Sequence, residues 1–306
     1  MIRPAGRPVA TGVLVAVVLI ALVAFCRPTV PAEAPDVDAP RPGSPASMFT
    51  LVQTNLCLSG LAGCFDSAGY PNIIDETVRR IQTAEPDAVT MNEACRLDAV
   101  RIARRTGYRV RFVPVRYADE LLPCVDPGGR GLFGLAVLTK SPVAGSESDV
   151  FRAQAELEER RWLCVSTVDG VDVCTAHLEA PDTDDAAAAN DGQCAELSRV
   201  LADRGSQSLL FGGDLNRRGS CAPAGAWNHT DAASDRLPGL QHVYGSTAFD
   251  DPVAEVVSWP FSDHDLLVVS AGRTAPGRRG PSAGRRGRAG TGERRRSPGA
   301  GRAARS

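Results

Sequence analysis

The sequence has 306 residues and a formal net charge of -2, and 43% of its residues are hydrophobic. The charge is unevenly distributed. Residues 48–270 carry 32 acidic and 19 basic side chains, a balance of -13, whereas residues 272–306 carry eleven arginines and one glutamate. Such an acidic body excludes a uniformly basic nucleic-acid surface, so a polyanion would need a local arginine cluster, bound cations or the tail.

The first 26 residues are typical of a signal peptide or an N-terminal anchor. Arg3 and Arg7 precede an apolar run over residues 9–25, and a Pro/Ala-rich linker follows over residues 27–47. A charged start, an apolar stretch and small residues after it characterise secretory signals. The run is close to the length of a spanning helix, so its cleavage stays open. We expect the protein to be secreted or anchored at the extracellular face of a membrane.

The next part of the chain alternates predicted strands with predicted helices. In chain order we expect a strand over 48–56, a helix from Asn72 to Pro86 capped by Asn72, a strand over 87–93, a helix over 96–107 and a strand over 108–115. The first helix places Ile74, Val78 and Ile81 on one face, and Gly107 lies just beyond the second. The strand between the two helices finishes on the carboxylate of Glu93.

The second half continues this alternation. We expect a strand over 131–140, two strands within 161–178, a helix over 185–204, a strand from Ser208, a strand over 240–246 and a last strand within 262–270. Asp169 and Gly170 predict a hairpin turn. Residues 48–270 therefore form one predicted domain, buried by two sheets packed face to face with helices outside. The tail, residues 271–306, lacks periodic apolar positions and is expected to be disordered.

Eight cysteines lie in the predicted domain, and an even number behind an export signal indicates disulfides. Their spacings do not match a zinc site. The local pairs are Cys57 with Cys64, and Cys164 with Cys174 across the hairpin. The other four can pair in three ways: Cys95, Cys124, Cys194 and Cys221.

Polar side chains with potential chemistry stand at the ends of the predicted strands. These residues are Asn55, Glu93, His177, Asp214, Asn216, Asp263 and His264. Asp and Asn after two glycines are ordinary turn formers, so the stretch "GGDLN" alone does not indicate a site. Carboxylate and amide oxygens also bind Mg²⁺, while imidazoles assist water activation, leaving-group departure and charge stabilisation in phosphoester cleavage.

The motifs "TNL", "NE", "TAHLE", "GGDLN" and "SDHD" occur in the order typical of one family. In these motifs residues 48–270 resemble the endonuclease/exonuclease/phosphatase (deoxyribonuclease-like) superfamily. The resemblance implies an α/β four-layer sandwich, in which two mixed β-sheets pack face to face with helices outside. It also implies a site at one edge of the sheets, dependence on Mg²⁺ or on Mn²⁺ or Ca²⁺, and phosphoester cleavage.

The resemblance assigns five residues to metal binding. Glu93 is the expected principal carboxylate, and Asn55 is a ligand that also positions it. Asp214 and Asn216 contribute further oxygens. Asp263 is a further ligand or an acid that orients one.

The resemblance also assigns catalytic roles. Asp214 is expected to orient or deprotonate the attacking water, and Asn216 to contact metal or phosphate. His264, oriented beside Asp263, is expected to lie nearest the reacting phosphate. His177 would contact the phosphate or assist the leaving group. Four arginines are ordinary solvated charges, although the two that follow the site could hold a substrate phosphate: Arg160, Arg161, Arg217 and Arg218.

One departure from the family pattern concerns His264. Gln241 stands where family members carry an Asp that holds this histidine. We therefore expect weaker catalysis, catalysis by a neutral His264 imidazole, or Asp250 or Asp251 as the carboxylate that holds His264. No motif supplies the carboxylate partner expected for His177, and Glu120, near Tyr117, is a candidate without further support.

We therefore expect an exported, divalent-metal-dependent phosphoester hydrolase that acts as a monomer. A nuclease-like phosphodiesterase is favoured, and phospholipid or inositol-phosphate substrates stay open. The alternative is a catalytically silent binding module on the same fold. A third hypothesis is a disulfide-rich surface protein without phosphate chemistry.

Overall fold

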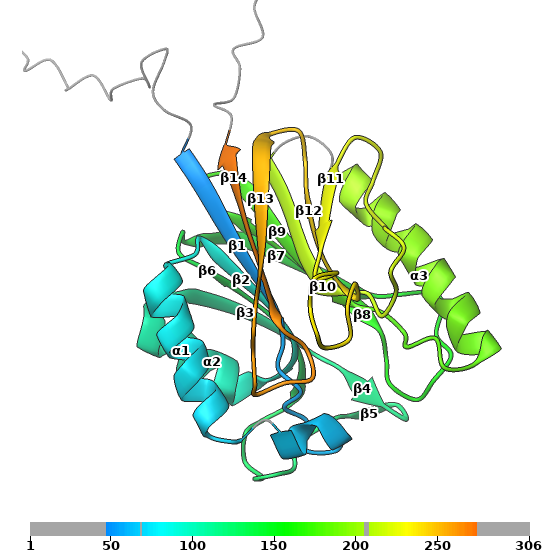
Figure 1. The fold of residues 1–306 in the computed structure, drawn as a ribbon. Helices are drawn as coiled ribbons and strands as arrows, with labels where there is room; N and C mark the ends of the chain where they lie inside the picture. The colour runs from blue at the N-terminus through cyan, green and yellow to red at the C-terminus, as the bar shows by residue number, and fades with distance from the viewer. Residues whose placement is uncertain (1–46, 68, 205–207, 274–306) are drawn as a thin grey trace, which may run out of the picture. The chain divides into compact units, whose positions relative to one another are not determined.

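A computed structural model describes residues 47–67, 69–204 and 208–273, and two β-sheets dominate this part of the chain (Figure 1). The predicted export segment, nearly all of the predicted linker and most of the predicted tail lie outside the described residues. Among the described helices, none is long and apolar enough to span a lipid bilayer.

Each sheet has six strands. In spatial order the first contains β13 (Phe249–Val257), β14 (Leu266–Arg273), β1 (Ser47–Asn55), β2 (Ala88–Cys95), β6 (Phe133–Thr139) and β3 (Arg109–Pro114). The second contains β11 (Trp227–Thr230), β12 (Gln241–Gly245), β10 (Ser208–Asp214), β9 (Val171–His177), β8 (Arg161–Thr167) and β7 (Val143–Val150). A small hairpin joins β4 (Arg116–Tyr117) to β5 (Glu120–Leu121), and η1 (Gly63–Ser67) is a short 3-10 helix.

Both sheets are mixed in the same way, with a parallel pair at the centre and antiparallel neighbours. Strands β1 and β2 are parallel and are joined through helix α1 (Asn72–Ala84). Strands β9 and β10 are parallel and are joined through helix α3 (Asp184–Asp203). Each sheet therefore contains one strand–helix–strand unit whose two strands end at the same edge.

The helices cover the outer faces of the two sheets. Helix α1 and helix α2 (Arg96–Thr106) lie on the first sheet, and α3 lies on the second (Figure 1). Between the sheets, Leu51 and Val137 pack against Val165, Val173 and Leu210. The predicted α/β four-layer sandwich, with two mixed sheets face to face and helices outside, is confirmed.

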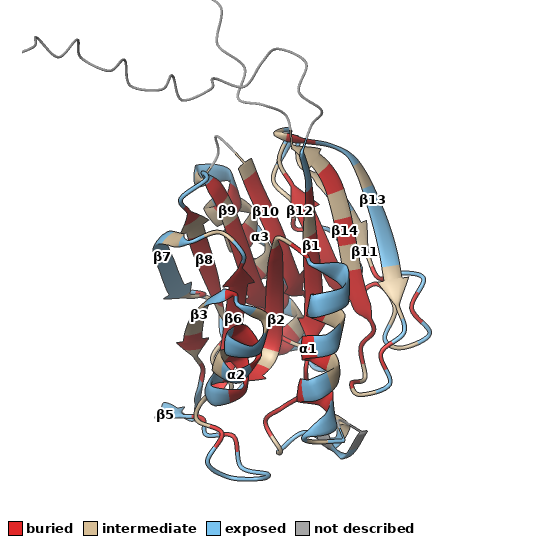
Figure 2. Ribbon diagram, turned by 90° about the vertical axis from the view of Figure 1, so that its left-hand side faces the viewer, coloured by how far each residue is buried: buried red, intermediate tan, exposed pale blue. Residues whose placement is uncertain are grey.

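The boundaries of several elements differ from prediction. Helix α1 begins at Asn72, but Pro71 occupies the cap position and no side chain caps the helix. Strand β2 runs two residues past Glu93 to Cys95. Strands β7, β11 and β13 were not expected. Strands β7 and β13 are exposed edge strands, pale blue in Figure 2, so their sequences lack an apolar alternation.

Four disulfides link the eight cysteines of the described domain. The two local pairs, Cys57–Cys64 and Cys164–Cys174, agree with the sequence prediction. The remaining pairs are Cys95–Cys124 and Cys194–Cys221, which selects one of the three open connectivities.

Candidate active site

The two parallel strand pairs bring their polar ends together at one edge of the sandwich. Asn55 ends β1, His177 ends β9 and Asp214 ends β10. The amide Nδ2 of Asn55 donates to Glu93 Oε1 at 2.8 Å and to Asp214 Oδ2 at 3.0 Å. One amide group therefore joins carboxylates from the two sheets.

Glu93 reaches this position because β2 is irregular where it lies. The pairing of β2 with β6 shifts between Met91 and Ala94, and Glu93 has a φ of 52°. This left-handed backbone is uncommon for a residue other than glycine and is often found at functional sites. The Glu93 carbonyl accepts a hydrogen bond from Leu58 N at 3.0 Å, which holds the loop after β1 against the bulge.

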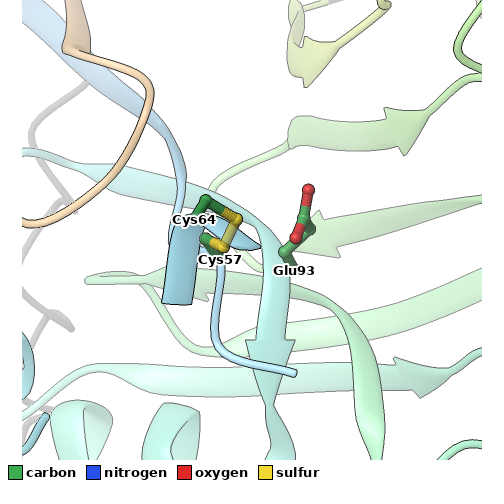
Figure 3. Close-up of side chains that lie close together, drawn as sticks. All are labelled: Cys57, Cys64 and Glu93. Atoms are coloured by element: carbon green, nitrogen blue, oxygen red, sulfur yellow. A yellow bond between two sulfur atoms is a disulfide. The ribbon is translucent and has the colours of Figure 1, made fainter. Parts of the chain in front are cut away.

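The Cys57–Cys64 disulfide lies beside the Glu93 carboxylate, as Figure 3 shows. Among the described residues these form the only group of three or more His, Cys, Asp or Glu side chains whose ligand atoms all lie within 4.8 Å of one another. Both sulfurs are used in the disulfide, so they cannot bind a metal as thiolates. The donors left at this edge are oxygens and imidazole nitrogens.

The Glu93 carboxylate is in a crowded acidic environment. Burial raises its pKa from 4.5 to about 7, and the charges of Glu158, Asp214 and Asp263 act in the same direction. The hydrogen bond from Asn55 opposes this shift. A cation placed among these carboxylates would relieve their repulsion.

Asp214 follows two glycines that belong to β10 and not to a turn. A Cβ on Gly212 would lie 2.3 Å from Thr90 Oγ1 of the first sheet, and a Cβ on Gly213 would lie 2.5 Å from the carbonyl oxygen of Ala176. Neither glycine has a positive φ. The glycines therefore allow close backbone approach, and the turn-former interpretation of "GGDLN" is wrong for them.

Asp214 is fully buried and faces two imidazoles. Its Oδ2 lies 3.2 Å from His264 Nε2 and 4.0 Å from His177 Nε2. Burial acts to raise the pKa of Asp214, but His264, His177 and the Asn55 hydrogen bond outweigh it, so the pKa lies below its ordinary value. The carboxylate is therefore ionised at neutral pH and accepts hydrogen bonds.

His177 lies between two N–H donors. Arg160 Nη1 is 3.2 Å from its Nδ1, and Asn216 Nδ2 is 3.1 Å from its Nε2. Burial and the charge of Arg160 lower the pKa of His177 to about 3. The imidazole is therefore neutral and has a single acceptor nitrogen. Asn216 has a φ of 50°, and its Nδ2 also donates to the Leu178 carbonyl.

The segment "SDHD" enters the site just before β14. Ser262 Oγ donates to the Asn55 carbonyl at 2.9 Å and also contacts Asp263 Oδ1 at 3.2 Å. His264 is 4% exposed and points Nε2 at Asp214. Asp263 is only partly buried and faces the same cleft.

A cleft of about 540 Å³ opens over these groups. Six of the seven predicted site residues line it, namely Glu93, His177, Asp214, Asn216, Asp263 and His264, while Asn55 lies beneath it. Ser59, Leu61 and Ala62 from the loop after β1 form one wall. Two other hollows, of about 210 and 160 Å³, lie over mostly apolar residues away from these groups.

The arginine that lines the cleft is Arg160, which sequence reasoning treated as solvated. It is 8% exposed and pairs with Glu158 at 2.7 Å and with Glu179 at 3.3 Å. Arg217 and Arg218 do not line the cleft: they contact helix α3 and the Pro238 carbonyl. No sequence signal distinguished these arginines, because the difference lies in long-range packing.

The carboxylates suggested as histidine partners are placed elsewhere. Asp250 and Asp251 are exposed on β13, and Glu120 is exposed on β5. The Nδ1 of His177 faces Arg160 and not a carboxylate. Gln241 is fully buried and instead bonds Asp231, a buried acid that sequence reasoning missed.

The donor set fits a hard divalent cation better than a soft one. Glu93, Asp214 and Asp263 supply carboxylate oxygens, and Asn216 supplies an amide oxygen that no described group uses as an acceptor. Asn55 presents its nitrogen to the two carboxylates and uses its oxygen for Cys57 N, an arrangement that positions Glu93. Oxygen ligands of this kind suit Mg²⁺, Mn²⁺ or Ca²⁺.

Comparison with known proteins places this arrangement in a family. The model of the Endonuclease/Exonuclease/phosphatase family matches residues 65–264. Comparison with curated protein sequences gave no match.

Solved structures share the fold. An endonuclease/exonuclease/phosphatase from Beutenbergia cavernae is 18% identical, with a TM-score of 0.56, and the match covers 74% of this chain and 72% of that one. The human Nocturnin catalytic domain with a bound sulfate anion is 15% identical, with a TM-score of 0.57 and coverage of 74% and 94%. A truncated Caenorhabditis elegans TDP2 is 16% identical, with a TM-score of 0.52 and coverage of 74% and 98%. From the family match and the shared fold, this chain belongs to the endonuclease/exonuclease/phosphatase family.

Proposed function

We propose that the protein is an exported, divalent-metal-dependent hydrolase of phosphoester bonds. The observation that carries the proposal is the convergence of Glu93, Asp214 and His264 in one cleft, with Asn55 bonded to both carboxylates. These residues come from four separate segments, and their contacts would be improbable for an ordinary surface loop. Family membership supports the same class of reaction.

The metal would be held by oxygens of Glu93, Asp214, Asn216 and Asp263. Asn55 would position Glu93 and Asp214 through its amide nitrogen, or would itself be a further ligand. When bound, Mg²⁺, Mn²⁺ or Ca²⁺ supplies charge neutralisation at the phosphate. The ionised carboxylate of Asp214 would accept a hydrogen bond from the attacking water and orient it.

The two histidines would have different roles. A guanidinium has N–H donors and no acceptor, so Arg160 donates to His177 Nδ1, which leaves the proton of the neutral ring on Nε2. His177 would then donate from Nε2 to a phosphate oxygen or to the leaving oxygen, and Asn216 would turn its amide toward the metal or the phosphate. His264, beside Asp214, would stabilise the growing negative charge.

Export is supported by the four disulfides, because such bonds persist in oxidising compartments. The N-terminal segment that would direct it lies outside the described residues. We also propose that the protein acts as a monomer, since the cleft is built from one chain.

For the substrate we propose a nuclease-like phosphodiesterase first. The cleft contains four carboxylates and one arginine, and Glu158 and Glu179 already pair with that arginine. A nucleic acid would therefore be bound through metal-coordinated phosphate and not through a basic surface.

A phospholipid substrate is the second candidate, because apolar side chains stand exposed at the cleft. Leu61 is 62%, Tyr117 46% and Leu237 45% exposed, and all three line it. They could contact an apolar group next to the phosphate.

Purified full-length protein should be assayed with Mg²⁺ or Mn²⁺ on plasmid DNA, RNA, sphingomyelin and a phosphoinositide, with EDTA as the metal-free control. Asp214→Asn should reduce turnover about a hundredfold or more, in line with the loss of one such group elsewhere. Asp98→Asn removes a buried carboxylate that does not line the cleft and is the matched control. Metal binding without turnover on any substrate would instead support the silent binding module, and no metal binding would support the surface-protein hypothesis.

A further inference from the structure

The layer between the two sheets changes from apolar to polar beneath the cleft. Gln53, Asn92 and Gln241 are all fully buried there. Gln53 Nε2 donates to Gln241 Oε1 at 3.2 Å and to Asn92 Oδ1 at 2.7 Å. Asn92 Oδ1 also accepts from the backbone N–H of Asp214 at 2.8 Å. A row of amide hydrogen bonds thus connects β12 to the backbone beneath Asp214.

Gln241 extends this row toward the other side of the site. Its Nε2 donates to the carbonyl oxygen of Asp265 at 2.6 Å and to Asp231 Oδ2 at 3.2 Å. Asp265 directly follows His264, so the first bond holds the backbone next to this histidine. With its oxygen bonded to Gln53, the Gln241 amide uses both its donors and its acceptor.

Asp231 is a fully buried carboxylate without a basic ion-pair partner among the described residues. Its Oδ1 accepts from the backbone N–H groups of Gly239 at 2.8 Å and Gln241 at 3.1 Å. Burial raises the pKa of Asp231, and the Gln241 hydrogen bonds and the nearby His264 oppose that shift. Asp231 therefore places a buried carboxyl group behind the catalytic edge, and Gln241 lies against it.

His264 depends on its backbone for position. Its Nδ1 is buried and has no hydrogen-bond partner among the described residues. Its backbone N–H donates to Ser262 Oγ at 3.2 Å, and Gln241 holds the next carbonyl. These two contacts hold the backbone that carries the imidazole, and the ring itself has one polar contact, from Nε2 to Asp214 Oδ2 at 3.2 Å.

We propose that Asp231 and Gln241 form a positioning pair that holds the His264 segment and the backbone of Asp214 in their working geometry. The inference rests on the proposed hydrolase function. The pair also explains the amide at position 241. A carboxylate there would lose the donor to Asp265 and would face the carboxylate of Asp231 in a buried layer.

The test is a charge-swap cycle with the isosteric variants Gln241→Glu, Asp231→Asn and the double variant. The probe is bis(p-nitrophenyl) phosphate with saturating Mn²⁺, and Asp98→Asn is the buried, remote control. We expect Gln241→Glu to lower kcat about a hundredfold with KM within about twofold, because the pair does not touch substrate. The double variant should regain about tenfold, since it removes the like-charge contact but not the lost bond to Asp265.

Two further readouts separate positioning from a general loss of structure. The Mn²⁺ dissociation constant from calorimetry should stay within about threefold in all variants, because the pair is not among the metal oxygens. The control should lower the unfolding temperature without changing kcat. If Gln241→Glu does not fold, the double variant decides: a folded, active double variant supports the pair, and an unfolded or inactive one overturns it.

The outcomes also separate this inference from the proposed function. A wild type without metal-dependent turnover on any substrate contradicts the hydrolase itself. The positioning pair alone is overturned if wild type is active and Gln241→Glu has the same kcat. It is also overturned if the kcat of the double variant is no higher than that of Gln241→Glu.

Discussion

Replacing Glu93 by glutamine should stabilise the metal-free protein while it removes metal-dependent activity. The Glu93 side chain is 17% exposed, and burial with neighbouring carboxylates raises its pKa from 4.5 to about 7. At roughly 1.4 kcal/mol per pKa unit, ionising this group costs about 3 kcal/mol more in the folded protein than in the unfolded chain. Glutamine keeps the oxygen that accepts from Asn55 but carries no charge.

The sign of the effect depends on pH. Because the folded pKa of Glu93 is raised, the protonated carboxyl contributes stability that is complete below pH 4.5 and is lost as the pH rises through about 7. At pH 8 the ionisation of Glu93 therefore destabilises folded wild type by the full amount of about 3 kcal/mol, and at pH 5 by less than about 1 kcal/mol. The gain from Glu93→Gln should follow the same profile.

Thermal unfolding in EDTA measures this gain. At pH 8 Glu93→Gln should unfold roughly 5–10 °C above wild type, as expected for about 3 kcal/mol in a domain of this size. Glu120→Gln, at an exposed carboxylate on β5, is the matched control and should leave the unfolding temperature unchanged. Added Mg²⁺ should raise the unfolding temperature of wild type but not of Glu93→Gln. A variant less stable than wild type at pH 8, or one with an equal gain at pH 5, would refute the buried-charge argument.

Two further substitutions test the packing beneath and beside the site. Gly212→Ala should destabilise the protein by roughly 2 kcal/mol, because its Cβ would lie 2.3 Å from Thr90 Oγ1, whereas Gly63→Ala meets nothing within 4 Å and should cost less than about 0.5 kcal/mol. Urea denaturation measures both, and equal losses would contradict the close-approach argument. Arg160→Met should cost roughly 3 kcal/mol because it leaves the buried Glu179 and the partly buried Glu158 unpaired, whereas Arg217→Met breaks an exposed ion pair and should cost about 1 kcal/mol or less. Denaturation of the two arginine variants side by side checks this, and a smaller loss for the buried arginine would contradict it.

The strand ends of this fold could be predicted because each combines a local pattern with a polar terminus. His177 ends a strand that an Asp-Gly turn places in a hairpin, and Asp214 ends an apolar run. Those signals lie within about ten residues of sequence. The exposed edge strands β7 and β13 carry no such signal, and pairing to one neighbour alone decides their structure.

Arg160 and Asp231 could not be identified in this way. Arg160 precedes a strand, as solvated arginines often do, and only packing against Glu158, Glu179 and His177 buries it. Asp231 lies in a connection between β11 and β12, where an acid is an ordinary turn residue. Its burial follows from the position of Gln241 across the pair, a contact that no local pattern encodes.

One sequence signal for the buried amides does exist, and it is the change of residue type along the inward face of each central strand. Side chains two residues apart share a face, so the inward series can be read directly. In the parallel pair of the first sheet, the series is Leu51, Gln53, Asn55 in β1 and Ala88, Thr90, Asn92 in β2. In the parallel pair of the second sheet, it is Val173, Thr175, His177 in β9 and Leu210, Gly212, Asp214 in β10. Each series begins apolar in the shared core and becomes polar toward the edge that carries the cleft.

This gradient explains how a polar layer can exist inside the sandwich. Parallel strands end at one edge, so four inward series become polar at the same depth, and their side chains meet each other and not an apolar partner. Gln53 Nε2 then donates to Asn92 Oδ1 and to Gln241 Oε1 from the antiparallel strand β12, and Asn92 Nδ2 donates to Thr175 and Ala176 of β9. Replacing a single amide by leucine would leave its partners unpaired in a layer closed to water, a cost of roughly 1–3 kcal/mol for each group. The polar layer is therefore stable only as a complete set of hydrogen-bonded side chains. The residues that position the site keep the regular in–out alternation of a strand, but their inward-facing side chains are polar.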